Sequence, residues 1–119
     1  MTNKIILANA FSLQMITSII EDTPLVQFRA MELDEVKDVV EFAGTRGILT
    51  NAIGHADTAH IVGNMIGATL VPNRINVSLD ENTTIIVAQV IGGRLPEGCT
   101  TLPEGTKIKF IEVSLMTEC

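Results

Sequence analysis

A histidine that follows a glycine has the clearest chemical potential in this sequence. Ile53-Gly54-His55 ends a short apolar run, and a helical pattern begins at Asp57. Gly54 permits a sharp turn, which places His55 at or just before a helix N-terminus. Free N–H groups and the positive end of the helix dipole favour a phosphate at such a point. Because histidine exchanges protons near neutrality, His55 is a candidate acid or base on a phosphate ester. An exposed capping residue is the alternative.

A glycine-rich segment later in the chain is a second candidate. Residues 92–105 form a loop, and loops longer than about 12 residues are often functional. It opens with Gly92-Gly93-Arg94-Leu95-Pro96-Glu97-Gly98. The glycines allow a ligand to approach the backbone closely, and Arg94 offers a planar fork that matches a phosphate. A plain turn with solvated charges is the alternative, and local spacing alone favours it.

Polar residues after the first strand pattern are weaker candidates. Asn9 ends an apolar run and Ser12 precedes a helical one, and ligand crevices form at the carboxyl ends of strands in α/β sheets. Locally, each is better explained as a capping residue. His60 lies about 140° around the helix from His55, so the two cannot chelate one metal as an i,i+4 pair would. No carboxylate cluster has metal-ligand spacing. We therefore expect a site without metal or cofactor.

The hydrophobic pattern indicates which elements position these residues. Ser12 is the expected N-cap of the first helix, Gly44 the end of the second and Gly67 the end of the third. Residues 74–79 and 84–91 are expected to pair as an antiparallel hairpin. The predicted strands are 4–8, 25–31, 48–53, 74–79, 84–91 and 107–115, and the predicted helices are 13–20, 34–42 and 57–66. Strands and helices alternate first and strands dominate later, so we predict an α/β fold in one domain, residues 1–119, with a mixed five-stranded β-sheet flanked by helices.

Composition restricts the core and the partners. The chain has 119 residues, fits one domain and contains no Trp or Tyr, so its core must be built mainly from aliphatic side chains. The net charge is −6, with 14 acids against 8 bases. Because duplex DNA binding needs a basic stripe, we expect no duplex DNA partner. No apolar run is long enough for a membrane helix. Cys99 and Cys119 are too few for a disulfide framework, which favours the cytoplasm.

Four short motifs, taken together, resemble one known family. They are Leu7-Ala8-Asn9-Ala10-Phe11-Ser12, Ile53-Gly54-His55, Pro72-Asn73-Arg74 and Gly93-Arg94-Leu95-Pro96-Glu97-Gly98. In this order they resemble the viral anti-CRISPR ring nucleases of type III systems and their bacterial and phage relatives. Each motif is weak alone, and the resemblance extends from about Lys4 to the last strand.

The resemblance implies a function and a set of site residues. Members of that family are homodimers that bind cyclic tetra-adenylate across the dimer interface and cleave it without metal. It implies that His55 is the catalytic histidine, with Glu97 and Arg94 near the scissile phosphate. Ligand contacts are implied for Asn9, Ser12, Arg74 and Gln89, and more loosely for Gln14 and Thr58. Gln89 lies five residues before Arg94, where four are expected.

The resemblance also implies a symmetric C2 homodimer in the cytoplasm, that of the host if the source is viral. A C2 interface uses one patch twice, so paired arginines would face the four phosphates of one ring. Two other functions remain open at this point. One is a sensor that binds a cyclic oligonucleotide without cutting it, and the other is a small viral or phage protein associated with nucleic acid.

Overall fold

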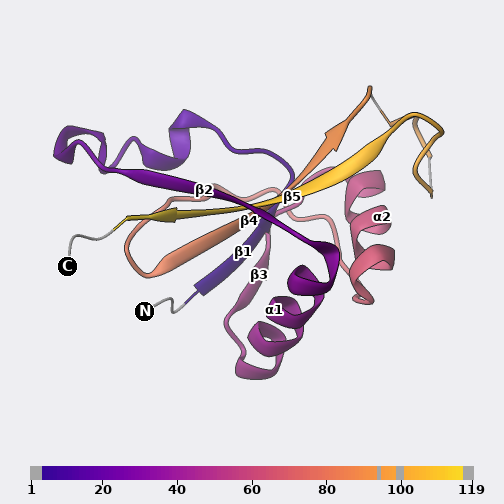
Figure 1. Cartoon of the computed structure of the whole chain (residues 1–119), viewed down its shortest axis with the longest axis horizontal. Coiled ribbons are helices and arrows are strands. Elements are labelled where there is room, and N and C mark those ends of the chain that lie inside the picture. The colour runs from indigo at the N-terminus through magenta and orange to yellow at the C-terminus, as the bar shows by residue number, and fades with distance from the viewer. Residues whose placement is uncertain (1–3, 94, 99–100, 117–119) are drawn as a thin grey trace.

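The computed structural model describes residues 4–93, 95–98 and 101–116, which form one mixed β-sheet with helices packed on it (Figure 1). The strand order is β2-β5-β4-β1-β3. The strands are β1 (Lys4–Ala8), β2 (Val26–Met31), β3 (Leu49–Asn51), β4 (Thr83–Ile91) and β5 (Lys107–Leu115). The predicted α/β class and five-stranded mixed sheet are confirmed.

Three neighbouring strands run in the same direction. β1 pairs in parallel with β3 and with β4, whereas β5 pairs antiparallel with both β4 and β2. The carboxyl ends of β1, β3 and β4 therefore meet at one edge of the sheet. In α/β sheets this is the edge at which ligand crevices form.

Two α-helices, α1 (Leu33–Arg46) and α2 (Ala56–Ile66), cover one face of the sheet (Figure 1). In α1 the buried Val36, Val40 and Ala43 recur at spacings of four and three, which places them on one side of the helix. They join a core cluster with β1, β4 and α2 that includes Leu7, Ile86 and Val62. Phe110 is the one aromatic residue in the described buried core, so the core is aliphatic, as composition predicted.

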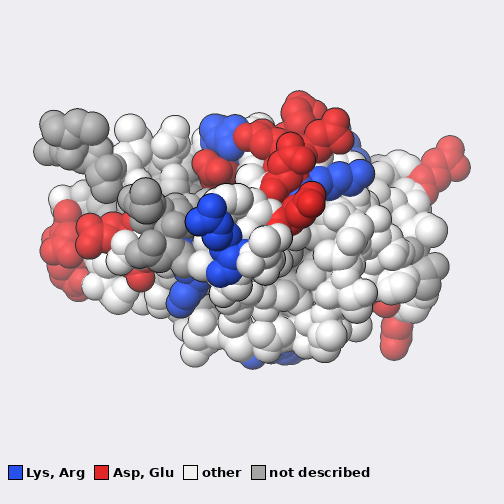
Figure 2. Space-filling view, turned by 90° about the horizontal axis from the view of Figure 1, so that it is seen from below, with Lys and Arg blue, Asp and Glu red and all other residues white. Residues whose placement is uncertain are grey.

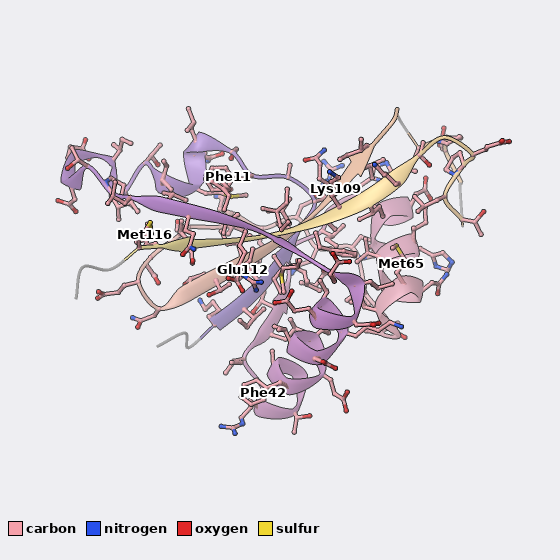
Figure 3. All side chains as sticks on the ribbon, viewed as in Figure 1. Phe11, Phe42, Met65, Lys109, Glu112 and Met116 are labelled. Carbon is pink, nitrogen blue, oxygen red and sulfur yellow. The ribbon has the colours of Figure 1, made fainter. Side chains whose placement is uncertain are left out.

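The opposite face is covered by irregular segments. The buried Ile16 and Leu79 pack on Ile6, Ile85 and Val87 of the sheet. Two side chains labelled in Figure 3 pack on opposite faces of the sheet. Phe11 packs on this cluster, and Met65 packs on the core cluster between the sheet and the two α-helices. The sheet is therefore buried on both faces over its central strands.

The predicted helix over 13–20 is wrong. Two short 3₁₀ helices, η1 (Leu13–Ile16) and η2 (Ile20–Asp22), stand in its place. The apolar residues Leu13, Ile16 and Ile19 recur at intervals of three, which matches the three residues per turn of a 3₁₀ helix. Leu13 is 73 % exposed and only Ile16 is buried, so the segment lacks the apolar stripe that would stabilise an α-helix.

The predicted strand over 74–79, and its hairpin with 84–91, are also wrong. β4 pairs with β1 along one edge and with β5 along the other, so no free edge remains for a hairpin partner. Residues 74–79 are unpaired instead, and the Leu79 N–H donates to the Met15 carbonyl at 2.8 Å. The alternating pattern reflects side-chain packing and not strand pairing, because Val77 and Leu79 are buried although residues 74–79 belong to no strand.

Smaller differences concern element ends. α1 does not end at Gly44 but continues to Arg46, and Gly47 follows it with a φ of 71°. β3 is shorter than the predicted 48–53, and the Ile53 N–H donates to the Asn51 side chain and not to a neighbouring strand. The strands at 4–8 and 107–115 are as predicted, and α2 is followed by Gly67 as expected.

An ion-pair network connects the outer strand β2 to α1 and β5. Arg29 contacts Glu35 of α1 at 2.6 Å and Glu112 of β5 at 3.3 Å. The hydrogen bond from Arg29 lowers the pKa of Glu35. On the face shown in Figure 2, basic side chains form separate spots with acidic ones between them. None of the helices in the described residues is long and apolar enough to cross a bilayer.

Candidate functional site

The carboxyl edge of the parallel strands carries two adjoining hollows. Asn9 directly follows β1, and His55 comes four positions after the last residue of β3. Both residues line both hollows. Gln89, near the end of β4, lines the first hollow, and Arg74 lines the second. Four residues that the sequence selected from four separate segments are therefore neighbours.

His55 is the N-cap of α2, so its predicted place at a helix N-terminus is confirmed, and the alternative description as an exposed capping residue also holds. Its backbone is extended, with φ −90° and ψ 121°, and its ring Nδ1 accepts the Thr58 N–H at 3.3 Å. The Thr58 hydroxyl oxygen lies 3.1 Å from the same nitrogen. Since Nδ1 is an acceptor, the neutral ring carries its proton on Nε2. The ring is exposed and lines both hollows, and Nε2 has no hydrogen-bond partner among the described residues.

Arg74 is positioned by a set of amide hydrogen bonds at the end of β3. The Asn51 side chain donates to the Val71 carbonyl at 2.7 Å. The Asn73 side chain donates to the Asn51 carbonyl at 2.8 Å, and the Asn73 N–H donates to the Ile53 carbonyl at 2.9 Å. These bonds attach the Pro72-Asn73-Arg74 motif to the segment that carries His55.

Gly54 is required by the close approach of Arg74. A Cβ at position 54 would lie 2.5 Å from Cγ of Arg74, which is too short for two carbons. Arg74 Nε donates to the Gly54 carbonyl at 3.5 Å. The missing side chain thus gives the arginine stem a place beside the His55 backbone.

The loop after β4 reaches the first hollow. Gly93 and Leu95 line it, and the Gly98 N–H donates to Asp57 Oδ2 of α2 at 2.9 Å. At the base of the loop, Gly92 has a φ of 102°, and a side chain there would collide with the Gly105 carbonyl. The loop is therefore held at its base and at the first turn of the helix that begins after His55.

The remaining predicted residues are placed less closely. Glu97 is exposed in a turn beside Gly98 and lines neither hollow. Ser12 is exposed, makes no side-chain capping bond and lines neither hollow. Gln14 also lines neither hollow. Arg94, Cys99 and Cys119 lie outside the described residues. His60 is exposed near Asn64, as its helical angle predicted.

Sequence reasoning missed two residues of this region. Asp57 holds the loop, but its partner is 41 positions away, and no local pattern marks that contact. Lys109 (labelled in Figure 3) is exposed and is paired with Gln89 in the β4–β5 register, although it lines neither hollow. Paired residues share one sheet face, so strand alternation and a correct β4–β5 pairing would have found it.

The described residues contain no group of three or more His, Cys, Asp or Glu side chains arranged to hold a metal ion. The chemical groups that the hollows do present are an imidazole, a guanidinium, three side-chain amides and a threonine hydroxyl. These groups donate hydrogen bonds to phosphate oxygens, and the guanidinium also neutralises charge.

Comparison with known proteins identifies the family. The family model described as STIV B116-like matches residues 5–112. The solved structure of B116 of Sulfolobus turreted icosahedral virus (STIV) is similar, with a TM-score of 0.79 and 29% sequence identity over 93% of this chain and 98% of that chain. No curated protein matches the chain. The family match covers nearly the whole sheet and every element of the site, and the chain belongs to the STIV B116-like family.

Proposed function

We propose that this protein is a metal-independent ring nuclease that cleaves cyclic tetra-adenylate and so switches off type III CRISPR signalling. One observation carries the proposal: His55, Arg74, Asn9 and Gln89 line adjoining hollows at a single sheet edge. These are four of the residues to which the ring-nuclease resemblance assigns catalysis and ligand contact, whereas Glu97 and Ser12 of the same set line neither hollow. Membership of a family that includes a viral protein is in keeping with an activity directed against host immunity.

The chemistry needs no external nucleophile. A ribose 2′-oxygen attacks its own neighbouring phosphorus, the bond from phosphorus to the 5′-oxygen breaks, and a 2′,3′-cyclic phosphate forms. His55, in its protonated form, gives a proton to the leaving 5′-oxygen, while the 2′-hydroxyl proton passes to a base, for which Glu97 is the candidate. General acid catalysis of this kind contributes about 10²–10⁴-fold. Arg74 and Arg94 neutralise charge on the phosphate, and Asn9, Ser12 and Gln89 hold the nucleotide.

A second copy of the chain completes the site in this proposal. In a C2 homodimer, two copies of Arg74 and Arg94 supply four cations to four phosphates. Two His55 residues make two cuts on opposite sides of the ring, and the products are linear di-adenylates. Although the net charge of the chain is −6, a few cations gathered at one place are enough to bind an anionic ligand.

The test is a cleavage assay of His55→Ala on cyclic tetra-adenylate in EDTA. We expect binding to be retained within a few-fold and cleavage to fall by about 10²-fold or more, because the proton donor is lost. His60→Ala is the matched control, since His60 is also exposed on α2 and lines neither hollow. Cleavage by His55→Ala at the wild-type rate would reject the assignment. An intact ring after long incubation with the wild-type protein would favour the non-catalytic sensor.

A further inference from the structure

We propose that Thr58 is a positioning residue that holds the His55 ring in one orientation through both of its protonation states. This inference rests on the proposed function for its catalytic consequence, but not for its geometry. Thr58 is 5 % exposed, and both its backbone N–H and its hydroxyl lie within 3.3 Å of His55 Nδ1. Two groups of one buried residue therefore converge on one ring nitrogen.

The two groups of Thr58 serve different states of the ring. In the neutral ring, Nδ1 is an acceptor and takes the Thr58 N–H, which leaves the proton on Nε2. In the protonated ring, Nδ1 carries a proton and needs an acceptor, which a backbone N–H cannot provide. The Thr58 hydroxyl oxygen, at 3.1 Å, can accept that proton as well as donate its own.

The consequence is that Nε2 stays directed to the same place when the proton arrives and when it leaves. On protonation, Nδ1 can no longer accept the Thr58 N–H, so a ring without the hydroxyl would have no partner at Nδ1 and would be free to rotate. A proton donor must lie within hydrogen-bond reach of the leaving oxygen, so rotation reduces the productive fraction. Thr58 also lines the first hollow, but the role proposed for it acts on catalysis through His55.

Thr58→Val tests this, because valine has nearly the same shape and keeps the backbone N–H but lacks the hydroxyl. We expect kcat to fall about tenfold or more, as part of the contribution of the general acid, while KM changes less than twofold. Thr58→Ser keeps the hydroxyl and is expected to restore kcat to within about threefold of the wild type. Thr83→Val is the control: Thr83 is equally buried, and its hydroxyl bonds to Asp80 in a distant turn.

A second measurement does not depend on activity. Long-range ¹H–¹⁵N NMR spectra of the wild-type protein should give an acceptor-type shift for Nδ1 of His55 and a protonated-type shift for Nε2, with His60 as internal reference. The opposite tautomer would overturn the proposal, and so would a Thr58→Val variant with unchanged kcat. If the wild type cleaves no ring, the proposed function fails, whereas the NMR result still decides whether Nδ1 of His55 accepts the Thr58 N–H.

Discussion

At the scale of single residues, a missing side chain can matter as much as a present one. Gly54 lies between Ile53, which is fully buried, and His55, which caps α2. Its backbone needs no left-handed conformation, so alanine would fit the chain path. What excludes alanine is the stem of Arg74, whose Cγ occupies the place of the Cβ. A substitution here displaces the arginine while the strand and the helix remain.

We therefore predict that Gly54→Ala folds normally but binds cyclic tetra-adenylate about tenfold or more weakly. A hydrogen bond to a charged group contributes about 1.5–3 kcal/mol, and the displaced Arg74 loses it. Calorimetric titration with the ring measures the change. Gly44→Ala, in α1 where a Cβ meets nothing within 4 Å, should bind as the wild type does. Undiminished affinity in Gly54→Ala would show that Arg74 does not contact the ligand from its present place.

Single residues with distinctive chemistry could be predicted from the sequence, but the residues that hold them in place by hydrogen bonds could not. His55 and Arg74 stand out by type and by their neighbours in short motifs. The supports of Arg74 are Asn51 and Asn73, which bond to backbone groups about 20 positions away. Asparagine in such contexts is usual for any turn, so nothing local distinguishes a structural amide from a ligand-binding one.

At the scale of elements, one hydrogen bond joins the loop after β4 to α2. Asp57 is in the first turn of α2, where an acidic residue also interacts favourably with the helix dipole. Its Oδ2 accepts the Gly98 N–H, which follows Glu97 directly. This link joins the loop to the first turn of α2, whose N-cap is His55.

We predict that Asp57→Ala frees this part of the loop. The Gly98 amide should exchange its hydrogen about tenfold or more faster, because a bond to a carboxylate of about 1.5–3 kcal/mol is lost. Hydrogen exchange followed by NMR measures this directly. Asp34→Ala is the matched control, since it removes an acid from the first turn of α1 and leaves the loop bond intact. An unchanged Gly98 exchange rate in Asp57→Ala would contradict the link.

Element positions were predicted well where local pattern decides and poorly where distant pairing decides. The strands at Lys4–Ala8 and Lys107–Leu115 needed only their own apolar residues. Residues 74–79 alternate as a strand does, yet the parallel pairing of β1 with β4 takes the edge that a hairpin would need. That pairing joins segments about 80 residues apart, so the pattern of a short stretch of sequence cannot predict it.

The same segment gives a prediction about stability. Leu79 is fully buried and Ile75 is 44 % exposed, although both belong to the alternating pattern. Leu79→Ala should lower the free energy of unfolding by about 2–5 kcal/mol, as expected for a cavity in a core. Ile75→Ala should change it by about 0.5 kcal/mol or less, like other surface substitutions. Urea unfolding of the two variants measures the difference, and equal losses would mean that 74–79 packs differently.

At the scale of the whole molecule, the sheet directs the polar ends of three parallel strands to one edge, while both faces carry the core. Apolar residues therefore build the scaffold, and the chemistry is confined to the residues that follow each strand. A molecule with a net charge of −6 repels an oligonucleotide at long range. In the proposed function, binding therefore depends on a few guanidiniums at close contact, and a second chain would double their number.

The last prediction concerns the proposed homodimer. We expect one cyclic tetra-adenylate to bind per two chains, measured by native mass spectrometry, and affinity to fall with salt. Each contact to a single-stranded phosphate contributes about 0.7 to the slope of log K against log salt. Arg74→Gln in both subunits should therefore reduce the slope by about 1.4, from two contacts of about 0.7 each. Arg46→Gln is the control, since Arg46 stacks on Phe42 at the end of α1. One ring per chain, with a slope insensitive to Arg74, would mean that each chain binds alone.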